Sequence, residues 1–303
     1  MLATFSDYFD LNKLMGMLPN ASEHGKDIDQ MLNICHWFML ILFAVWFGIY
    51  CAALIKFRKG RHPKADYHGM RGHVSSHLEF SVIILEAVIL FGLGIPLWAK
   101  RVAQIPDQEK SDDTKVLKIR AIGFQFGWQL HYAGADGKFG RQNTHFIVPG
   151  ANPLGIDPND ENGKDDAVVL NNMHLVYGKA TIVRVSSLDV IHGFALHQMR
   201  VQQDAIPGTE APMWFRPVAL SPADGWQIIC AQLCGAGHPG MIANYFCDTD
   251  KDYAAWYKEQ MDLTQSKLAD QRKDIEAKEA KEAAEAKAEA EHPHGAEHGE
   301  AKH

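Results

Sequence analysis

Hydrophobic residues are concentrated in two long runs near the N-terminus. From Met31 to Ile55 the chain has 25 consecutive residues without Asp, Glu, Lys or Arg. At 1.5 Å per residue, a helix of that length exceeds the roughly 30 Å hydrocarbon core of a bilayer. A second run, Phe80 to Ala99, contains Glu86 as its only charge. Both runs are apolar on every side, which favours membrane spans over buried helices of a soluble protein.

The segment between the two runs is strongly basic. It carries six Lys or Arg residues against two acidic residues, whereas residues 1–30 contain only two lysines. Positive loops stay on the cytoplasmic side, so the hairpin loop is expected to face the cytoplasm. The sequence therefore predicts a multi-pass protein of the bacterial inner (cell) membrane, with both termini and everything after residue 100 on the periplasmic side.

After about residue 115 the pattern changes to short β-rich runs separated by turns. Eight or so such runs in about 135 residues predict an all-β sandwich or a small barrel. The segment "GANPLGIDPNDENGKDD", residues 150–166, interrupts them and is expected to be a polar surface loop.

The last fifty residues form a separate compositional region. They are rich in Ala, Glu and Lys and offer i,i+4 pairs such as Asp274 with Lys278, which is typical of a solvated helix. No apolar stripe is evident, and the closing histidines favour a flexible tail over a metal site. The chain thus divides into an outer-face segment (1–30), a transmembrane hairpin (31–99), a β-domain (100–252) and a charged helical, His-rich tail (253–303).

The composition limits the classes of partner that the sequence predicts. The 303 residues are 47% hydrophobic, enough for a core, and the net charge is −7 at pH 7 with no basic block in the predicted outer domain. Nucleic acid is therefore not expected as a partner. The net negative charge is compatible with a basic protein as a partner.

The stretch "CAQLCGAGHPGM", residues 230–241, carries the chemistry. Cys234, His238 and Met241 supply thiolate, imidazole and thioether, and His192 lies 38 residues before Cys230. Such soft ligands on a β-sandwich select an electron-transfer copper. Those four residues complete a mononuclear site, so Cys230 is surplus. Two bridging thiolates would instead hold two coppers, each with two sulfurs and one imidazole, and with Met241 and a backbone carbonyl between the cysteines in the weak positions.

Three other interpretations use the same residues. Cys230 and Cys234 could form a disulfide, since the outer face of a bacterial membrane is oxidising. Zinc could take two Cys and two His, although Met241 fits that ion poorly. A single blue copper would leave Cys230 as a packing residue.

Over residues 30–250 the chain resembles subunit II of heme-copper cytochrome c oxidases. The stretches "DVIHGFALHQMRVQQDAIPG" and "CAQLCGAGHPGM" carry the resemblance, together with the hairpin. It implies a cupredoxin-like fold and a dinuclear copper centre, CuA. The ligands it implies are His192, Cys230, the carbonyl of Gln232, Cys234, His238 and Met241.

The resemblance also implies a function. A reduced c-type cytochrome would donate electrons to CuA, and they would pass to heme in subunit I. Oxygen would be reduced to water there, coupled to proton translocation. The chain would thus be the electron-transfer subunit of an enzyme complex, with subunit I, other oxidase subunits, the cytochrome and the lipid membrane as partners.

Further positions match the family pattern less closely. Phe126, or Trp128 two residues on, would receive the electron from the cytochrome; core packing is the alternative for both. Glu79 would lie at the mouth of a proton-uptake pathway or simply begin a helix. Asp189 and Asp204 would dock the cytochrome or serve as turn residues.

Gln232 departs from the family pattern. Family members usually have a glutamate there that also binds magnesium at the border with subunit I. A neutral amide is a weaker ligand for Mg²⁺ than a carboxylate, which argues against a magnesium role at this position.

Two other functions remain as alternatives. A quinol oxidase subunit II shares the fold but lacks copper, and the complete ligand set argues against it. A membrane-anchored copper-binding or copper-delivery protein would need ligands that release the metal readily, unlike a closed site with five side chains.

Overall fold

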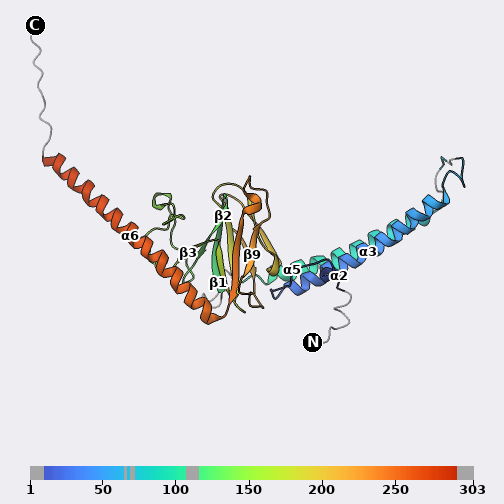
Figure 1. Ribbon diagram of the computed structural model, residues 1–303, viewed down its shortest axis with the longest axis horizontal. Helices are drawn as coiled ribbons and strands as arrows, with labels where there is room; N and C mark the ends of the chain where they lie inside the picture. Colours follow the sequence, from blue (N-terminus) through green and yellow to red (C-terminus); the bar gives the residue numbers. More distant parts are fainter. Residues whose placement is uncertain (1–9, 65–66, 69–71, 107–115, 292–303) are drawn as a thin grey trace, which may run out of the picture.

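The computed structural model describes residues 10–64, 67–68, 72–106 and 116–291. It consists of a long helical hairpin, a β-sandwich and a C-terminal helix, with the hairpin and the C-terminal helix on opposite sides of the sandwich (Figure 1). The four histidines predicted to lie in the tail fall outside the described residues: His292, His294, His298 and His303.

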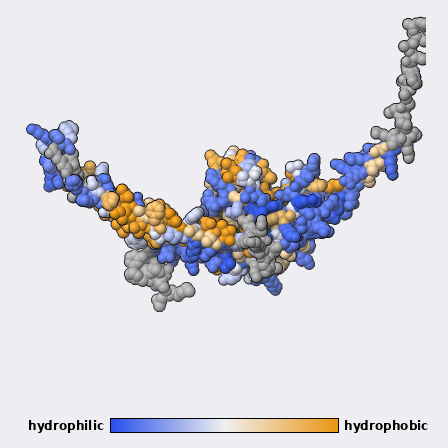
Figure 2. Space-filling view, turned by 180° about the vertical axis from the view of Figure 1, so that it is seen from behind, coloured by the Kyte–Doolittle hydropathy of each residue, from blue (hydrophilic) through white to orange (hydrophobic). Residues whose placement is uncertain are grey.

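The hairpin contains the two apolar runs. Its elements, with the short helix that precedes them, are α2 (Leu11–Leu14), α3 (Gly25–Lys56), α4 (Val74–Ile89), the π-helical turn η1 (Leu90–Gly94) and α5 (Ile95–Ala103). Two helices, Gly25–Lys56 and Ser76–Ala103, are long and apolar enough to cross a membrane, and none of their most apolar stretch is buried within the described chain. Figure 2 shows this apolar surface along the hairpin. The prediction of two apolar N-terminal helices is confirmed.

Pro96 interrupts the second helix without ending it. Proline has no N–H to donate, so a regular α-helix would lose a hydrogen bond here. The preceding turn widens into the π-helix η1, in which the N–H of Ile95 donates to the carbonyl of Leu90. The helix then continues as α5 toward the β-domain.

The β-domain is a sandwich of two five-stranded sheets. The strands are β1 (Val116–Phe124), β2 (Gly127–Tyr132), β3 (Ala167–Leu170), β4 (Asn172–Val176), β5 (Ala180–Ser187), β6 (His192–Leu196), β7 (Val201–Ala205), β8 (Ala211–Phe215), β9 (Trp226–Cys230) and β10 (Ile242–Asp248). One sheet has the order β3-β2-β1-β5-β8 and the other β4-β10-β9-β6-β7. The structure thus confirms the predicted sandwich and has ten strands rather than eight.

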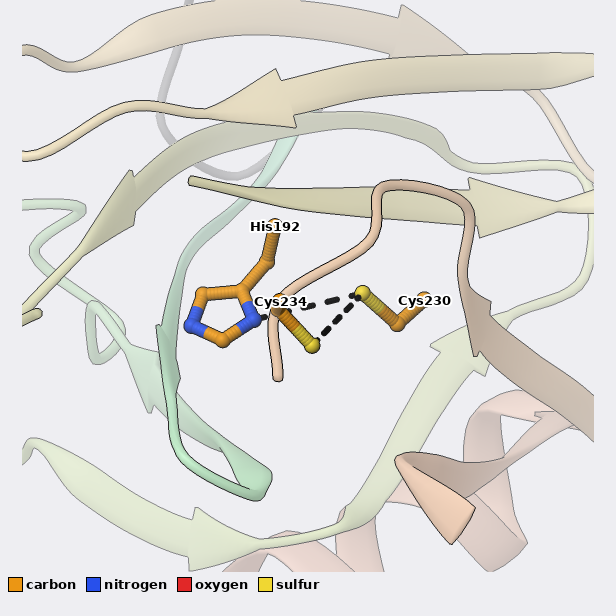
Figure 3. A group of neighbouring side chains, drawn as sticks. All are labelled: His192, Cys230 and Cys234. Carbon is orange, nitrogen blue, oxygen red and sulfur yellow. Dashed lines mark hydrogen bonds between the residues drawn. The ribbon is translucent and has the colours of Figure 1, made fainter. Parts of the chain in front are cut away.

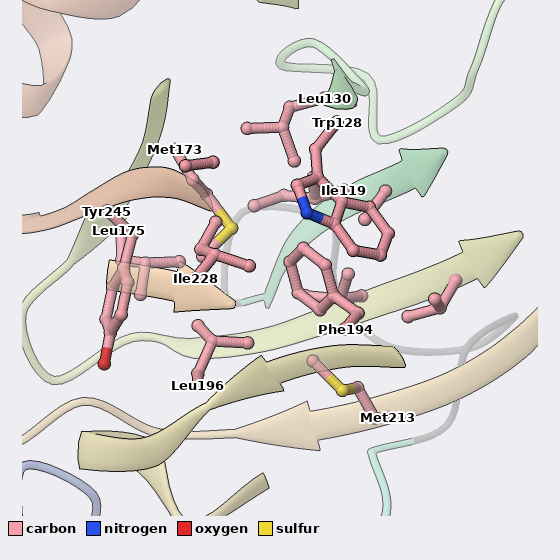
Figure 4. Packing of buried hydrophobic residues seen from close by; sticks show 14 of the residues in the cluster. Ile119, Trp128, Leu130, Met173, Leu175, Phe194, Leu196, Met213, Ile228 and Tyr245 are labelled. Carbon is pink, nitrogen blue, oxygen red and sulfur yellow. The ribbon is translucent and has the colours of Figure 1, made fainter. Parts of the chain in front are cut away.

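Large side chains from the inner faces of both sheets fill the core. The indole of Trp128, on β2, packs edge-on against the ring of Phe194, on β6, with ring centroids 4.8 Å apart. Both are fully buried, as are Ile228 and Tyr245 from the second sheet. Figure 4 shows these side chains interlocking between the layers. Such packing fixes the ends of the strands, where the cysteine loop begins.

The C-terminal helix α6 (Asp250–Glu291) is not solvated along its whole length, so the prediction of a solvated helix is wrong for its first half. Its first half packs on the sandwich: Leu268 is only 3% exposed and Thr264 only 7%. Trp256 stacks on His174, with ring centroids 4.0 Å apart. The Thr264 hydroxyl accepts a hydrogen bond from the N–H of Val168, on the edge strand β3. The helix therefore covers a sheet edge that would otherwise be open.

The segment 150–166 is also less open than predicted. Leu154 and Ile156 are buried and pack with Leu268 of α6. The buried amide of Asn152 donates to the carbonyl of Ile156 at 2.8 Å and to the side chain of Gln271 at 2.9 Å. The C-terminal helix thus holds this loop through both apolar contacts and hydrogen bonds.

The hairpin is tied to the sandwich at its near end. The N–H of Ala21 donates to the carbonyl of Gln198, and the N–H of Val218 donates to the carbonyl of Ala21, both at 2.8 Å. Arg200 forms a 2.7 Å ion pair with Asp29 of α3. The described part of the N-terminal segment and the sandwich therefore lie at the same end of the hairpin, as a two-span topology requires.

Candidate metal centre

The strand pairing brings the separated sequence motifs together. β6 and β9 are antiparallel, with Phe194 opposite Cys230. The first residue of β6, His192, therefore lies beside the last residue of β9, Cys230. The chain then forms a loop through Cys234 and the 3-10 turn η5 (His238–Gly240) before β10 begins. Two rigid strands thus support a loop that carries the remaining donor groups.

Soft donor atoms converge inside this loop. The Cys230 sulfur lies 3.7 Å from the Cys234 sulfur and 3.9 Å from Nδ1 of His192. Figure 3 shows the three side chains pointing toward one another, and their ligand atoms all lie within 4.8 Å of each other. The distance between the sulfurs is far greater than the roughly 2.05 Å of a disulfide bond. Both cysteines are free thiols.

The second half of the loop supplies the other donors. Nδ1 of His238 lies 3.5 Å from the Cys234 sulfur, and Sδ of Met241 lies 3.8 Å from it. The carbonyl oxygen of Gln232 lies 3.1 Å from the Cys230 sulfur. The structure therefore brings all six predicted donor groups to one place. Their arrangement is paired, because each sulfur has its own imidazole.

A carboxylate behind His192 sets its orientation. Nε2 of His192 lies 2.8 Å from Oδ1 of Asp189, which also accepts from the N–H of Val190, while Oδ2 accepts from the N–H of Gln125. Burial would raise the pKa of Asp189, but these hydrogen bonds outweigh it and lower the pKa below its usual value. The ionised carboxylate keeps the imidazole proton on Nε2 and leaves Nδ1 free to bind a metal.

The Cys234 thiol resists ionisation without a metal. Burial, and after it the neighbouring Cys230, raise the pKa of Cys234 to about 11. A metal bound to Cys234 must therefore displace its thiol proton.

Gln232 and Asp204 form a second contact behind the loop. The side-chain amide of Gln232 donates to both carboxylate oxygens of Asp204, at 3.1 and 3.2 Å. Asp204 lies on β7 and pairs with Gly193, the residue after His192. Both aspartates predicted for docking are thus engaged within the site, a relationship that their positions in the sequence did not reveal.

The two aromatic candidates lie at different depths. Phe126 is 40% exposed and lies so close to Gly237 that a β-carbon there would come within 2.4 Å of its ring. Trp128 is fully buried, with its ring 5.9 Å from that of His192. Phe126 therefore covers the loop from outside, whereas Trp128 supports the imidazole from the core.

Glu79 and Gln125 lie outside the set of donor groups. Glu79 is exposed on α4, near the far end of the hairpin, and takes no part in this cluster. Gln125, which the sequence analysis did not single out, donates from its side chain to the carbonyl of Cys234 at 2.7 Å. The only indication of this role in the sequence was that Gln125 is a polar residue in an otherwise apolar stretch next to Phe126.

Comparison with known proteins identifies the family. The family model described as "Cytochrome C oxidase subunit II, periplasmic domain" matches residues 117–244. The "Alternative cytochrome c oxidase subunit 2" of Bradyrhizobium diazoefficiens is 30% identical over 263 residues, which are 86% of this chain and 89% of that protein. The chain belongs to the cytochrome c oxidase subunit II family.

Other members of this family are more distant. The "Cytochrome c oxidase subunit 2" of Cereibacter sphaeroides is 26% identical, and the aligned part is 80% of this chain and 79% of that protein. Among solved structures, the periplasmic domain of subunit II of cytochrome oxidase (CoxB) of Bradyrhizobium japonicum is 28% identical, covers 48% of this chain and 92% of its own, and gives a TM-score of 0.32.

Family membership confirms the main predictions from the sequence. As a cytochrome c oxidase subunit II, the chain combines two apolar N-terminal helices with a β-sandwich domain consistent with a cupredoxin-like fold. The family supplies a subunit of an oxidoreductase complex anchored in a membrane. It also implies copper, and the His192, Cys230 and Cys234 cluster suits that metal in its donor types.

Proposed function

We propose that this chain accepts electrons from a reduced c-type cytochrome at a dinuclear copper centre and passes them to heme in subunit I. The observation that supports this proposal most directly is the paired donor set. Two unbonded sulfurs lie 3.7 Å apart, and each has its own imidazole Nδ1 beside it. A single copper would use one sulfur of this pair, and a disulfide neither. Two metals use both.

Each donor residue has a defined part in the proposal. Cys230 and Cys234 would bridge the two coppers, and His192 and His238 would bind one copper each. Met241 and the Gln232 carbonyl would take the weak positions. When bound, the copper pair supplies one-electron acceptance and donation. A closed donor set on two paired strands changes little in geometry between redox states, which favours fast transfer.

An apolar rim around the loop supports the docking of a protein partner. Leu233 is 84% exposed in the loop, and Phe126 lies against Gly235 and Gly237 of the same loop. Ile191 and Ile206, next to His192 and to its pairing partner Ala205, are also exposed. Figure 2 shows apolar surface gathered at this end of the sandwich. We propose that the cytochrome binds over this rim. Phe126 would be the first residue to receive the electron from the cytochrome, and Trp128 would support the imidazole of His192.

Asp189 and Asp204 have a different part in the proposal. Their carboxylates hold His192 and Gln232 respectively, so we assign them to positioning the copper loop. Docking of the cytochrome by these acids stays a prediction. We propose no magnesium ion on Gln232, because a neutral amide is a weaker ligand for Mg²⁺ than a carboxylate.

Orientation and proton uptake complete the proposal. The basic hairpin loop would face the cytoplasm and the sandwich the periplasm of a bacterial inner membrane. Glu79 would then lie at the cytoplasmic end of α4, where an exposed carboxylate can collect protons for subunit I. Oxygen reduction and proton translocation would take place in the other chain of the complex.

Copper loading of the full chain in detergent tests the proposal. We expect two coppers per chain by elemental analysis, a purple colour and a seven-line resonance signal from one unpaired electron shared by two metals. Cys230→Ser is expected to remove the signal, while Cys247→Ser, at a buried cysteine of β10 outside the donor set, should preserve it. One copper and a blue colour would indicate a mononuclear site. A colourless, copper-free chain would favour the quinol oxidase type.

A further inference from the structure

A cavity lies where the hairpin meets the sandwich, away from the copper loop. It has a volume of about 340 Å³ and is lined by residues of the N-terminal segment, of α5 and its end, and of β8 and the residue after it. This volume falls within the range of small-molecule sites. Among the lining residues are His24, Asp27, Lys100, Arg101, Trp214 and Arg216.

Arg101 and Trp214, which both line this cavity, each carry a buried hydrogen-bond donor without an acceptor in the described part of the chain. The guanidinium of Arg101 lies over the indole of Trp214 at 3.8 Å and donates from Nη2 to the Trp214 carbonyl. Its Nη1 is buried and has no partner among the described residues, and the same holds for Nε1 of Trp214. Buried donors without an acceptor are costly, and a small rotation of either side chain toward an oxygen-rich anion in the cavity would relieve that cost.

The charge balance of the cavity also suits an anion. Four cationic side chains line it against two carboxylates. Those carboxylates are already paired, Asp27 with Lys100 at 2.8 Å and Glu23 with Arg216 at 3.2 Å. No carboxylate forms a salt bridge with Arg101 within the described chain. Arginine is well suited to phosphate, because its planar fork presents two parallel donors.

An apolar groove of about 320 Å³ continues from the cavity along the hairpin. It shares Lys100 and Arg101 with the cavity and then passes between Met31 of α3 and Leu97 and Trp98 of α5. Gly94 lies on its wall, and a β-carbon there would be in van der Waals contact with the Met31 side chain, at 3.9 Å. The groove thus leads from a cationic end into the apolar surface of the two candidate spans.

The geometry points to a phospholipid site, in which Arg101 and Trp214 hold the headgroup phosphate and an acyl chain lies in the groove between α3 and α5. The occupant is an anionic phospholipid of the leaflet next to the sandwich. Free phosphate would satisfy the donors but leave the groove empty, whereas a lipid satisfies both. Basic residues beside tryptophan at a helix end are typical of the membrane interface, where headgroups lie. The bound lipid would join the hairpin to the sandwich.

Lipid retention by the full chain, and by the intact oxidase complex, tests this site. Native mass spectrometry of chain purified in mild detergent with added phosphatidylglycerol is expected to show one bound lipid per chain. Arg101→Gln should lower the bound fraction at least tenfold. Arg141→Gln, the same change in an exposed loop distant from the hairpin, should leave it unchanged. Unaltered copper content would show that the variants are folded.

A second variant separates the lipid from a free anion. Gly94→Leu fills the groove and leaves every polar group in place, so it should abolish lipid retention. Gly48→Leu, on an open face of α3, should not. Inorganic phosphate in excess should compete poorly with the lipid. The site is overturned if wild-type chain or complex retains no lipid, if Arg101→Gln and Gly94→Leu retain as much as wild type, or if phosphate displaces the lipid completely.

Discussion

Asp189 receives the Nε2–H of His192 at 2.8 Å, so a carboxylate three residues before the imidazole determines which ring nitrogen faces the cysteines. A ligand held this way is fixed both in tautomer and in ring orientation. The relationship links Asp189, a residue predicted for partner docking, to the metal centre.

Replacing that carboxylate should weaken copper binding. We expect Asp189→Asn to lower the affinity for copper by about 10- to 100-fold, the usual effect of losing the hydrogen-bond partner of a ligating histidine. Competition with a chelator of known affinity measures this. Asp224→Asn, at an exposed position outside the loop, serves as the matched control. Equal affinities for the two variants would show that Asp189 does not position His192.

The contact between Gln232 and Asp204 predicts a charge conflict. Gln232→Glu would place a second carboxylate against Asp204, and we expect it to lower the free energy of unfolding by about 1–2 kcal/mol at pH 7 through repulsion and a lost hydrogen bond. Thermal melting should show partial recovery in millimolar Mg²⁺ or at lower pH. Gln227→Glu, exposed on the adjoining strand β9, should change little. An unaltered melting temperature for Gln232→Glu would contradict the assigned contact.

The docked half of α6 should contribute to stability. Leu268→Ala removes a buried side chain from the small cluster with Ile156, and we expect a loss of about 2 kcal/mol, the low end for a buried leucine. Leu263→Ala, on the same helix but at a position 52% exposed, should cost far less. Hydrogen exchange in residues 150–156 should quicken only in the first variant. Similar behaviour of both variants would mean that the helix does not hold the loop.

The junction should weaken at acidic pH because of His24. Burial, and after it the charge of Arg101, lower the pKa of His24 from 6.5 to about 4, while Asp27 opposes the shift. Its folded-state pKa is below the unfolded value, so the folded state binds a proton less readily. Stability is therefore complete above pH 6.5 and falls as the pH drops toward 4.

Melting of the full chain in detergent at about pH 7.5 and about pH 4.5 measures this effect. We expect the pH-dependent loss to be smaller in His24→Asn than in wild type by about 1 kcal/mol, after allowance for partial solvent screening. Because the nearby acids Glu23 and Asp27 also titrate in this range, only the difference between the variants counts. His145→Asn, at an exposed histidine, is the control and should behave as wild type.

Local pattern in the sequence determined much of this protein. Uninterrupted apolar runs determined the two hairpin helices, because a helix that is apolar on every side has no other stable environment than a membrane or a partner. Short β-rich runs separated by turns determined the sandwich. The spacing and types of the loop residues from Cys230 to Met241, with His192, singled out the donor set, because few metals combine thiolate, imidazole and thioether ligands.

Only the tertiary structure decided how these parts support one another. The partners of Asp189 and Asp204, the docking of α6 through Leu268, and the cavity around Arg101 all depend on contacts between segments distant in the chain. Periodicity reports which face of an element is apolar, but it carries no information about which polar atom that face will meet. Strand pairing and packing between layers determine which polar atoms meet. They therefore also determine the orientation of His192 and which donors stay unpaired at the junction.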